Sequence, residues 1–159
     1  MRHVDRKRAE FILRQLGRLE TKSPRILDVG AGDLWLTKLL RARGYNVTSL
    51  DLSGRADIIA DFNTHNFKTS FDAIIAVEVV EHGLGLEKVF ALLKPGGIFI
   101  ATTIYPYFDF PCKILEAIGL AKPRKTAHTN LLYLKSLPYK LVDFEDYFMM
   151  DQFGAFGKG

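Results

Sequence analysis

The amino-acid sequence predicts an α/β protein built on a doubly wound, mostly parallel sheet. Short apolar segments that suit buried strands recur along the chain, at residues 25–29, 46–50, 71–77 and 98–103. Segments with helical spacing of apolar residues lie between them, and this alternation is typical of parallel sheets. With 159 residues, of which 48% are hydrophobic, the chain is most simply one domain.

The stretch 25–40, RILDVGAGDLWLTKLL, predicts a strand, a glycine turn and a helix. Residues 25–29 are apolar and bounded by Pro24 and Gly30, and apolar residues recur at helical spacing from Leu34 onward. Gly30 and Gly32 between them allow a ligand to approach the backbone. The free N–H groups of the next helix point to the same place, so we expect a ligand site here.

The residues around this turn restrict the ligand. The third glycine of a dinucleotide fingerprint would fall at position 35, which is Trp35. Asp28 stands two residues before the first glycine, where it would repel a pyrophosphate, and Asp33 follows the second. These carboxylates favour a ligand with positive charge, such as an α-amino group and a sulfonium. The pattern therefore argues against a nicotinamide oxidoreductase.

The pattern D-x-G-x-G resembles the first motif of the class I S-adenosylmethionine-dependent methyltransferases, with Leu34 in place of the last glycine of D-x-G-x-G-x-G. The run LLKPGGIFIATT, residues 92–103, resembles the motif that follows the family's fourth strand. The resemblance implies a Rossmann-like seven-stranded sheet, mostly parallel with an antiparallel C-terminal strand and helices on both faces. It also implies one domain over 1–159, with an N-terminal helix (1–22), a cofactor-binding half (23–103) and an acceptor-side half (104–159).

Residues 3–20 predict an amphipathic helix. The second strand, 46–50, ends in Asp51, where βαβ units place an acid that binds ribose hydroxyls. The third strand is expected at 57–60, so only residues 52–56 remain for a crossover that normally includes a helix. The resemblance places Asp61 and Phe62 at the adenine ring. It implies S-adenosylmethionine as cofactor, bound by the following residues: Asp28, Gly30, Ala31, Gly32, Asp51, Leu52, Asp61, Phe62 and Val77.

The rest of the chain predicts a helix at 86–93, a turn at 94–97 and a strand at 98–103. The aromatic segment 104–110 follows that strand and reads equally as a pocket for a flat acceptor or as a hydrophobic lid. A helix at 110–120, a basic loop at 121–129 and a short helix at 130–137 come next. Residues 139–147 and 149–157 predict an antiparallel pair of strands.

The segment EVVEH carries Glu78, Glu81 and His82 at the end of the fourth strand. Two carboxylates and an imidazole suit Mg²⁺ or Mn²⁺. The pattern resembles ubiquinone-biosynthesis O-methyltransferases and small-RNA 2′-O-methyltransferases, which bind a metal there, and His128 is the candidate further ligand. Related methyltransferases carry E-H without a metal, so a structural role stays open. We expect Glu81, His82 and His128 to be catalytic, with an imidazole as general base if no metal binds.

The net charge is +4, with basic clusters in residues 2–8, 41–43 and 122–125. Such clusters suit nucleic acid or an anionic membrane surface, but a solvated surface is the favoured interpretation, because no signature of an RNA-binding module appears. A single cysteine excludes an internal disulfide, and no apolar run approaches the roughly 18 residues of a membrane span. The N-terminus has no apolar signal region, so a cytoplasmic location is expected.

These observations lead to a methyltransferase that acts on an oxygen or nitrogen of a small molecule. One alternative is a metal-assisted RNA 2′-O-methyltransferase, which the basic clusters motivate. Another is a degenerate domain that binds the cofactor or a partner without catalysis, which Leu34 and the short crossover motivate. The sequence indicates neither the acceptor nor the oligomeric state.

Overall fold

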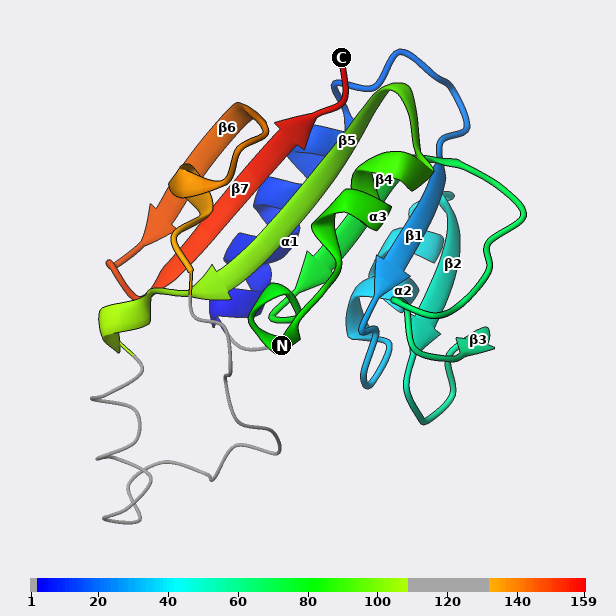
Figure 1. Cartoon of the computed structure of the whole chain (residues 1–159), viewed down its shortest axis with the longest axis horizontal. Helices are drawn as coiled ribbons and strands as arrows, with labels where there is room; N and C mark the ends of the chain where they lie inside the picture. Colours follow the sequence, from blue (N-terminus) through cyan, green and yellow to red (C-terminus); the bar gives the residue numbers. More distant parts are fainter. Residues whose placement is uncertain (1–2, 109–131) are drawn as a thin grey trace.

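The computed structural model describes residues 3–108 and 132–159 as three α-helices, three 3₁₀ turns and seven strands (Figure 1). The helices are α1 (His3–Leu16), α2 (Trp35–Arg41) and α3 (Leu86–Leu92). The strands are β1 (Arg25–Val29), β2 (Asn46–Asp51), β3 (Ile58–Ile59), β4 (Phe71–Val77), β5 (Leu93–Ile104), β6 (Lys140–Tyr147) and β7 (Asp151–Gly157). The 3₁₀ turns are η1 (Val80–His82), η2 (Pro106–Phe108) and η3 (Leu134–Ser136).

The seven strands form one sheet in the order β3-β2-β1-β4-β5-β7-β6. Neighbouring strands are parallel except where β7 runs antiparallel to both β5 and β6. This confirms the predicted sheet with an antiparallel C-terminal strand. The strand order reverses between β1 and β4, and ligands of open α/β sheets bind at such a reversal.

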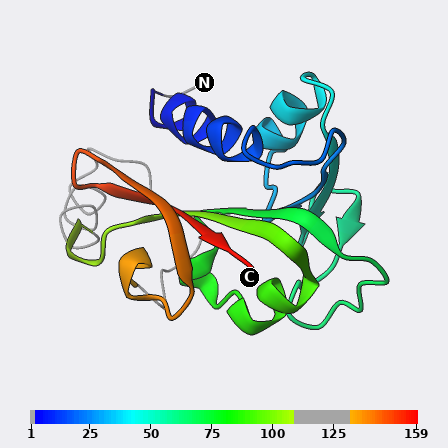
Figure 2. The ribbon, with the colours of Figure 1, turned by 90° about the horizontal axis from the view of Figure 1, so that it is seen from above.

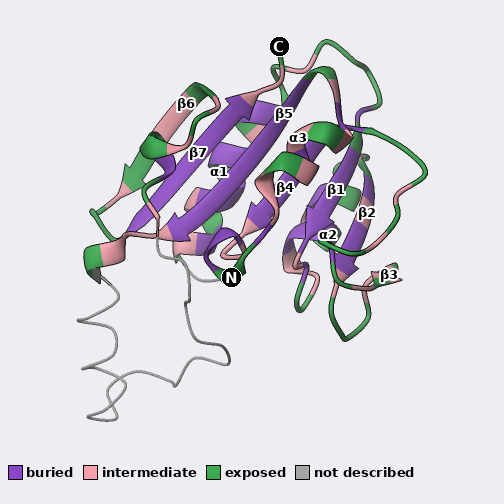
Figure 3. Ribbon diagram, viewed as in Figure 1, coloured by how far each residue is buried: buried purple, intermediate pink, exposed green. Residues whose placement is uncertain are grey.

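Helices cover both faces of the sheet, as predicted. In the edge-on view of Figure 2, α1 and α2 lie on one side and α3 on the other. Phe11 of α1 and Leu40 of α2 pack in one buried cluster, and Val89 of α3 packs in the second. The central strands are mostly buried, whereas β6 and β3 at the two edges contain only exposed and half-buried residues (Figure 3). No helix among the described residues is long and apolar enough to cross a membrane.

Several element ends differ from the predictions. The first helix stops at Leu16 rather than residue 20, because Gly17 follows and the chain tightens into 3₁₀-type bonds from Arg18 to Gln15 and from Leu19 to Leu16. β5 begins at Leu93, inside the predicted helix 86–93. Of the predicted helix 130–137, the described residues show only the 3₁₀ turn η3. The helix and loop predicted at 110–120 and 121–129 lie outside the described residues.

The connection between β2 and β3 has no helix, as the sequence indicated. Because β3 has only two residues, residues 52–57 suffice to bring it parallel to β2. Asp57 fixes this short connection: its carboxylate accepts bonds from the Ser49 N–H at 2.7 Å and the Ser49 hydroxyl at 2.8 Å, and it pairs with Arg41. The Asp57 carboxylate therefore helps to hold β3 beside β2 without a crossover helix.

The turn between β6 and β7 has an unusual conformation. Phe148 (φ 50°) and Met149 (φ 55°) are both left-handed, and the Met150 N–H donates to the Tyr147 carbonyl at 2.9 Å. These are the features of a type I′ turn, which favours Asn-Gly. A left-handed residue with a side chain costs about 1–2 kcal/mol, so Phe148 and Met149 are each strained.

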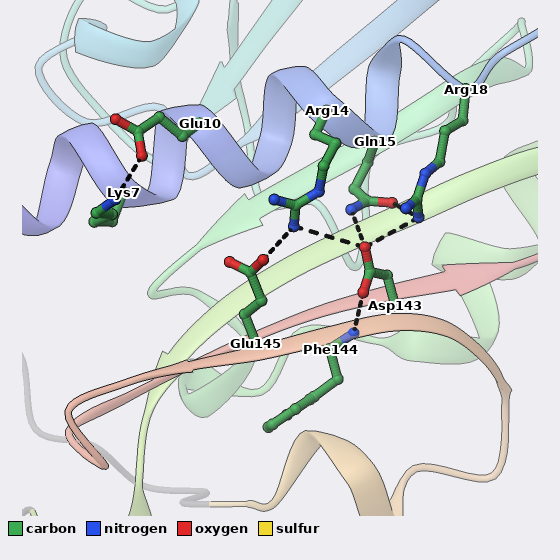
Figure 4. A network of polar contacts seen from close by, with 8 residues as sticks. All are labelled: Lys7, Glu10, Arg14, Gln15, Arg18, Asp143, Phe144 and Glu145. Atoms are coloured by element: carbon green, nitrogen blue, oxygen red, sulfur yellow. Dashed lines mark hydrogen bonds and ion pairs between the residues drawn. The ribbon is translucent and has the colours of Figure 1, made fainter.

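Polar contacts attach α1 to the edge strand β6 (Figure 4). The carboxylate of Asp143 accepts bonds from Gln15 at 2.7 Å and Arg18 at 3.0 Å, and Arg14 pairs with Glu145 at 2.6 Å. Burial alone would raise the pKa of Asp143, but these hydrogen bonds and arginine charges lower it below its usual value. The cations in the second half of α1 are thus engaged by acids of the same chain.

Candidate functional site

The candidate site lies where the loops after β1 and β4 meet, at the carboxyl edge of the sheet. Gly30 follows β1 with φ 68°, and a Cβ built on it would lie 2.3 Å from Cγ2 of Val79. The close approach therefore needs glycine, both for its conformation and for space. Val77, predicted to contact the cofactor, is half-buried at the end of β4.

The N–H groups of the glycine turn bond within the protein. Gly30 and Ala31 donate to the Leu50 carbonyl at 2.8 and 3.1 Å, and Gly32 donates to the Asp51 carboxylate at 2.9 Å. These three N–H groups are therefore used within the protein, whereas the expectation concerned the N–H groups at the start of the following helix and stays a prediction. The bonds of the glycine turn fix its shape against the end of β2.

Leu34 replaces the last glycine of the family motif but keeps a glycine-like conformation. Its φ is 65°, and it stands immediately before α2 as the N-cap. A leucine in this region costs about 1–2 kcal/mol. The substitution has therefore preserved the path of the turn and added strain to it.

Asp51 connects the two loops of the site. One carboxylate oxygen accepts the Gly32 N–H, and the other accepts the Ser53 N–H at 3.1 Å. Each carboxylate oxygen has a second lone pair, so Asp51 can still accept bonds from a ligand's hydroxyl groups. Leu52 beside it is 73% exposed and offers an apolar surface to a flat ring.

The Asp28 side chain is buried rather than exposed at the turn, and its expected role in cofactor binding stays a prediction. Its side chain is buried under the turn, and the Thr37 hydroxyl of α2 donates to it at 2.5 Å. Burial raises the pKa of Asp28 to about 6, although the bond from Thr37 opposes the shift. A strand covered on both faces gives its side chains no access to solvent. Asp28 therefore bonds to Thr37, and this bond joins β1 to α2.

This raised pKa predicts a pH dependence of stability. Between the ordinary pKa near 4 and the folded value of about 6, the native state binds more protons than the unfolded chain. Stability should therefore fall as the pH rises from about 4 to 6 and should then level off. The Asp28 contribution to this fall is of order 3 kcal/mol.

The wild type is compared with the variant Asp28→Asn, whose side chain keeps an oxygen for Thr37 and cannot ionise. Urea unfolding at pH 4.5 and 7.0 should show the variant gaining on the wild type by roughly 1–3 kcal/mol at the higher pH. An equal pH response of both proteins would show that Asp28 does not titrate in this range.

Asp61 and Phe62 are placed differently from each other. Phe62 is 4% exposed and belongs to the hydrophobic core, with its ring centroid 5.6 Å from that of Phe67. Asp61 is exposed and accepts the Asn63 N–H at 2.8 Å. Only the Asp61 carboxylate is thus on the surface where an adenine could meet it.

Asn63 has a positioning role that the sequence did not indicate. Its side chain donates to the Gly83 carbonyl at 3.0 Å and accepts the Gly85 N–H at 2.8 Å. Lys88 of α3 donates to the carbonyls of Asn63 and His65 at 2.9 and 2.7 Å. These bonds attach the loop after β3 to the loop after β4, and no motif marks them in the sequence.

The segment 78–82 does not assemble as a metal site in the described part of the chain. Glu78 is left-handed (φ 55°) and its carboxylate is bound by Arg8. Glu81 is buried, whereas His82 is exposed on η1. Among residues 3–108 and 132–159, no three His, Cys, Asp or Glu side chains are grouped to hold an ion, and the metal site stays a prediction. His128 lies outside the described residues.

Arg8 is the second residue that the sequence did not identify. Its side chain is 2% exposed, and it binds Glu78 of the β4 loop and Asp151 of β7, the latter at 3.1 Å. Asp5 lies 3.7 Å from the same guanidinium. Arg8 thus joins α1, the end of β4 and the start of β7 beside the candidate site.

Comparisons with known proteins agree with this architecture. A family model described as a methyltransferase domain matches residues 1–138. The sterol 24-C-methyltransferase ERG6B of Gibberella zeae is 30% identical over 156 aligned residues, which cover 77% of this chain and 41% of that protein. The chain spans about two fifths of the length of the curated relatives that it matches.

Two solved structures share the fold. The PH0226 protein of Pyrococcus horikoshii OT3 has a TM-score of 0.71 at 18% identity, covering 99% of this chain and 93% of its own. The 1,6-didemethyltoxoflavin-N1-methyltransferase of Burkholderia thailandensis, with bound 1,6-didemethyltoxoflavin and S-adenosylhomocysteine, has a TM-score of 0.66 at 18% identity, covering 96% and 77%. Together with the family match, they show that the chain belongs to the methyltransferase domain family, among the class I S-adenosylmethionine-dependent methyltransferases.

Proposed function

We propose that this chain transfers a methyl group from S-adenosylmethionine to an oxygen or nitrogen of a small molecule. The observation that carries the proposal is Asp51. Its carboxylate joins the loop after β1 to the loop after β2, on the β2 side of the strand-order reversal between β1 and β4, and keeps acceptor capacity for ribose hydroxyls. The exposed Leu52 adjoins it, so these two residues fit the nucleoside part of the cofactor.

The remaining residues supply position rather than reactivity. S-adenosylmethionine, when bound, supplies a methyl group that is already activated for transfer. The protein then has to hold donor and acceptor in line, and a base has to take the acceptor's proton. Among the described residues, His82 is the candidate for that base, because it is exposed at the carboxyl edge of the sheet. Nearby, Arg8 holds the carboxylate of Glu78 in position. The second imidazole expected to be catalytic, His128, stays a prediction.

One observation on charge bears on the choice between a small-molecule acceptor and RNA. Arg14 of α1 and Arg18 just after it are paired with Glu145 and Asp143 (Figure 4), which reduces the positive charge that this face offers to phosphates. The sterol 24-C-methyltransferase and the toxoflavin enzyme are named for small-molecule substrates. Both arguments support a small acceptor, with RNA as the alternative.

The test is calorimetric titration with S-adenosylhomocysteine. The wild type should bind, and Asp51→Ala should bind roughly 10- to 150-fold more weakly, because hydrogen bonds to a charged group contribute about 1.5–3 kcal/mol. Glu20→Gln, an exposed acid before β1, should bind like the wild type.

Asp51 also holds Gly32, so urea unfolding of Asp51→Ala has to accompany the titration. Equal affinity of Asp51→Ala and wild type would contradict the ribose assignment. No binding by a folded wild type would overturn the proposed function. Binding without production of S-adenosylhomocysteine from any small acceptor or RNA would favour a degenerate domain.

A further inference from the structure

The turn between β6 and β7 displays apolar side chains that the described fold does not use. Phe148 is 76% and Met149 64% exposed, and Met150 is exposed as well. We call these three residues the apolar tip. Phe148 and Met149 occupy left-handed positions that favour Asn and Gly, and both side chains stay largely exposed, so the turn holds strained residues with little burial to offset the strain.

The apolar tip is held in a fixed position. The Tyr107 hydroxyl donates to the Met149 carbonyl at 2.8 Å, and the Tyr105 N–H donates to the Met150 carbonyl at 2.8 Å. These bonds attach the turn to the segment after β5. The apolar tip is therefore an ordered part of the fold whose side chains are exposed.

Four tyrosines surround the base of the tip, and we call them the tyrosine collar: Tyr105, Tyr107, Tyr133 and Tyr147. The ring centroid of Tyr105 lies 5.1 Å from that of Tyr107 and 6.1 Å from that of Tyr133, and Tyr147 lies against Phe148 at 4.7 Å. Tyrosine has an apolar ring and a polar end, so it is enriched at the boundary between membrane and water. Apolar side chains at the tip with tyrosines behind them match the polarity gradient of a bilayer surface.

The charges at the edge of the collar are balanced among the described residues. The first turn of α1 lies beside the tip, with His3 Nδ1 2.5 Å from the Tyr147 hydroxyl. Arg6 is exposed and Lys7 half-buried on this turn, and both lie near one acid, Glu10. Asp146 is an exposed acid on the strand side. Two cations thus face two acids, so the apolar tip and the tyrosine collar carry the inference and net charge does not.

From these observations we infer that the apolar tip inserts into the surface of a lipid bilayer and holds the protein there reversibly. A convex tip needs a complementary pocket in a protein partner, whereas a bilayer accepts it without one. Asp151 follows the tip directly and shares Arg8 with Glu78. Insertion would therefore place the carboxyl edge of the sheet, and the candidate site on it, at the membrane. The inference goes beyond the proposed function and does not depend on it.

The test uses the double substitution Phe148→Asn and Met149→Gly in the full chain. Asn-Gly suits the turn, so the unfolding midpoint should rise by roughly 2–8 °C. Flotation with vesicles of phosphatidylcholine and phosphatidylglycerol should show that the variant binds at least tenfold more weakly than the wild type. Raised stability with lost binding separates insertion from misfolding.

Val142→Thr is the matched control, because Val142 is also exposed on β6 but lies away from the turn. It should bind vesicles like the wild type. Pure phosphatidylcholine vesicles should bind the wild type as well, because insertion of apolar side chains does not require anionic headgroups. Three outcomes would overturn the inference: no binding of the wild type to either vesicle, equal binding of the Asn-Gly variant, or a wild-type dimer that this variant dissociates.

Discussion

Arg8→Met is expected to lower the free energy of unfolding by about 3–5 kcal/mol, the usual effect of removing one partner from a buried ion pair. The guanidinium is buried and serves Glu78 and Asp151, with Asp5 at 3.7 Å. Methionine has a similar length, so the change removes the charge and hydrogen bonds with little change in volume. Urea unfolding followed by circular dichroism measures the loss.

Arg6→Met is the control for Arg8→Met on the same helix. Arg6 is exposed and lies 3.7 Å from Glu10, so its loss should change stability by no more than about 0.5 kcal/mol. Adding Asp151→Asn to Arg8→Met should recover part of the loss, because it removes a carboxylate left without Arg8. If Arg8→Met costs no more than Arg6→Met, the buried network does not join α1 to the sheet.

Gly30→Ala is expected to destabilise the protein by about 2–5 kcal/mol and to abolish cofactor binding. The left-handed conformation (φ 68°) contributes about 1–2 kcal/mol. Overpacking contributes about 1–3 kcal/mol more, because the new methyl would lie 2.3 Å from Cγ2 of Val79. Urea unfolding and titration with S-adenosylhomocysteine measure the two effects.

Two variants separate strain from overpacking in Gly30→Ala. Gly32→Ala is left-handed too (φ 51°), but the nearest atom to its Cβ is 3.9 Å away, so it should show the strain alone. Val79→Ala combined with Gly30→Ala should recover the share due to overpacking. If Val79→Ala recovers nothing, the contact between the two loops is not what requires glycine at position 30.

The sequence predicts β1, β2 and β4 well because each is a short apolar run between turn residues. β1 and β4 have the predicted bounds, and β2 differs only by including Asp51. The ends of helices are predicted less well, since α1 stops at Gly17 although its apolar spacing continues to Leu19. The spacing of apolar residues indicates which face of a helix is buried, whereas local hydrogen bonds determine where the helix ends.

Side-chain environments were harder to predict than elements. Asp28 belongs to a motif that favours a ligand. Its carboxylate is nevertheless buried and accepts a hydrogen bond from Thr37, nine residues later. Arg8 is assigned to the surface by its charge, although it shares the buried face of α1 with Phe11 and Ile12. Its partner Asp151 is 143 residues away, and no local pattern reports such a contact. Of the predicted cofactor residues, Gly30, Gly32 and Asp51 do come together in the structure.

The pairing of α1 with β7 affects the order of folding during synthesis on the ribosome. Arg8 and Asp151 are 143 residues apart. At about 5–20 residues per second, Asp151 is synthesised roughly 7–30 s after Arg8. During synthesis α1 emerges first, and its Phe11 has no Phe153 to pack against. Native docking of α1 is therefore a late event in the cell. A chain diluted from denaturant has both ends at once and avoids the delay.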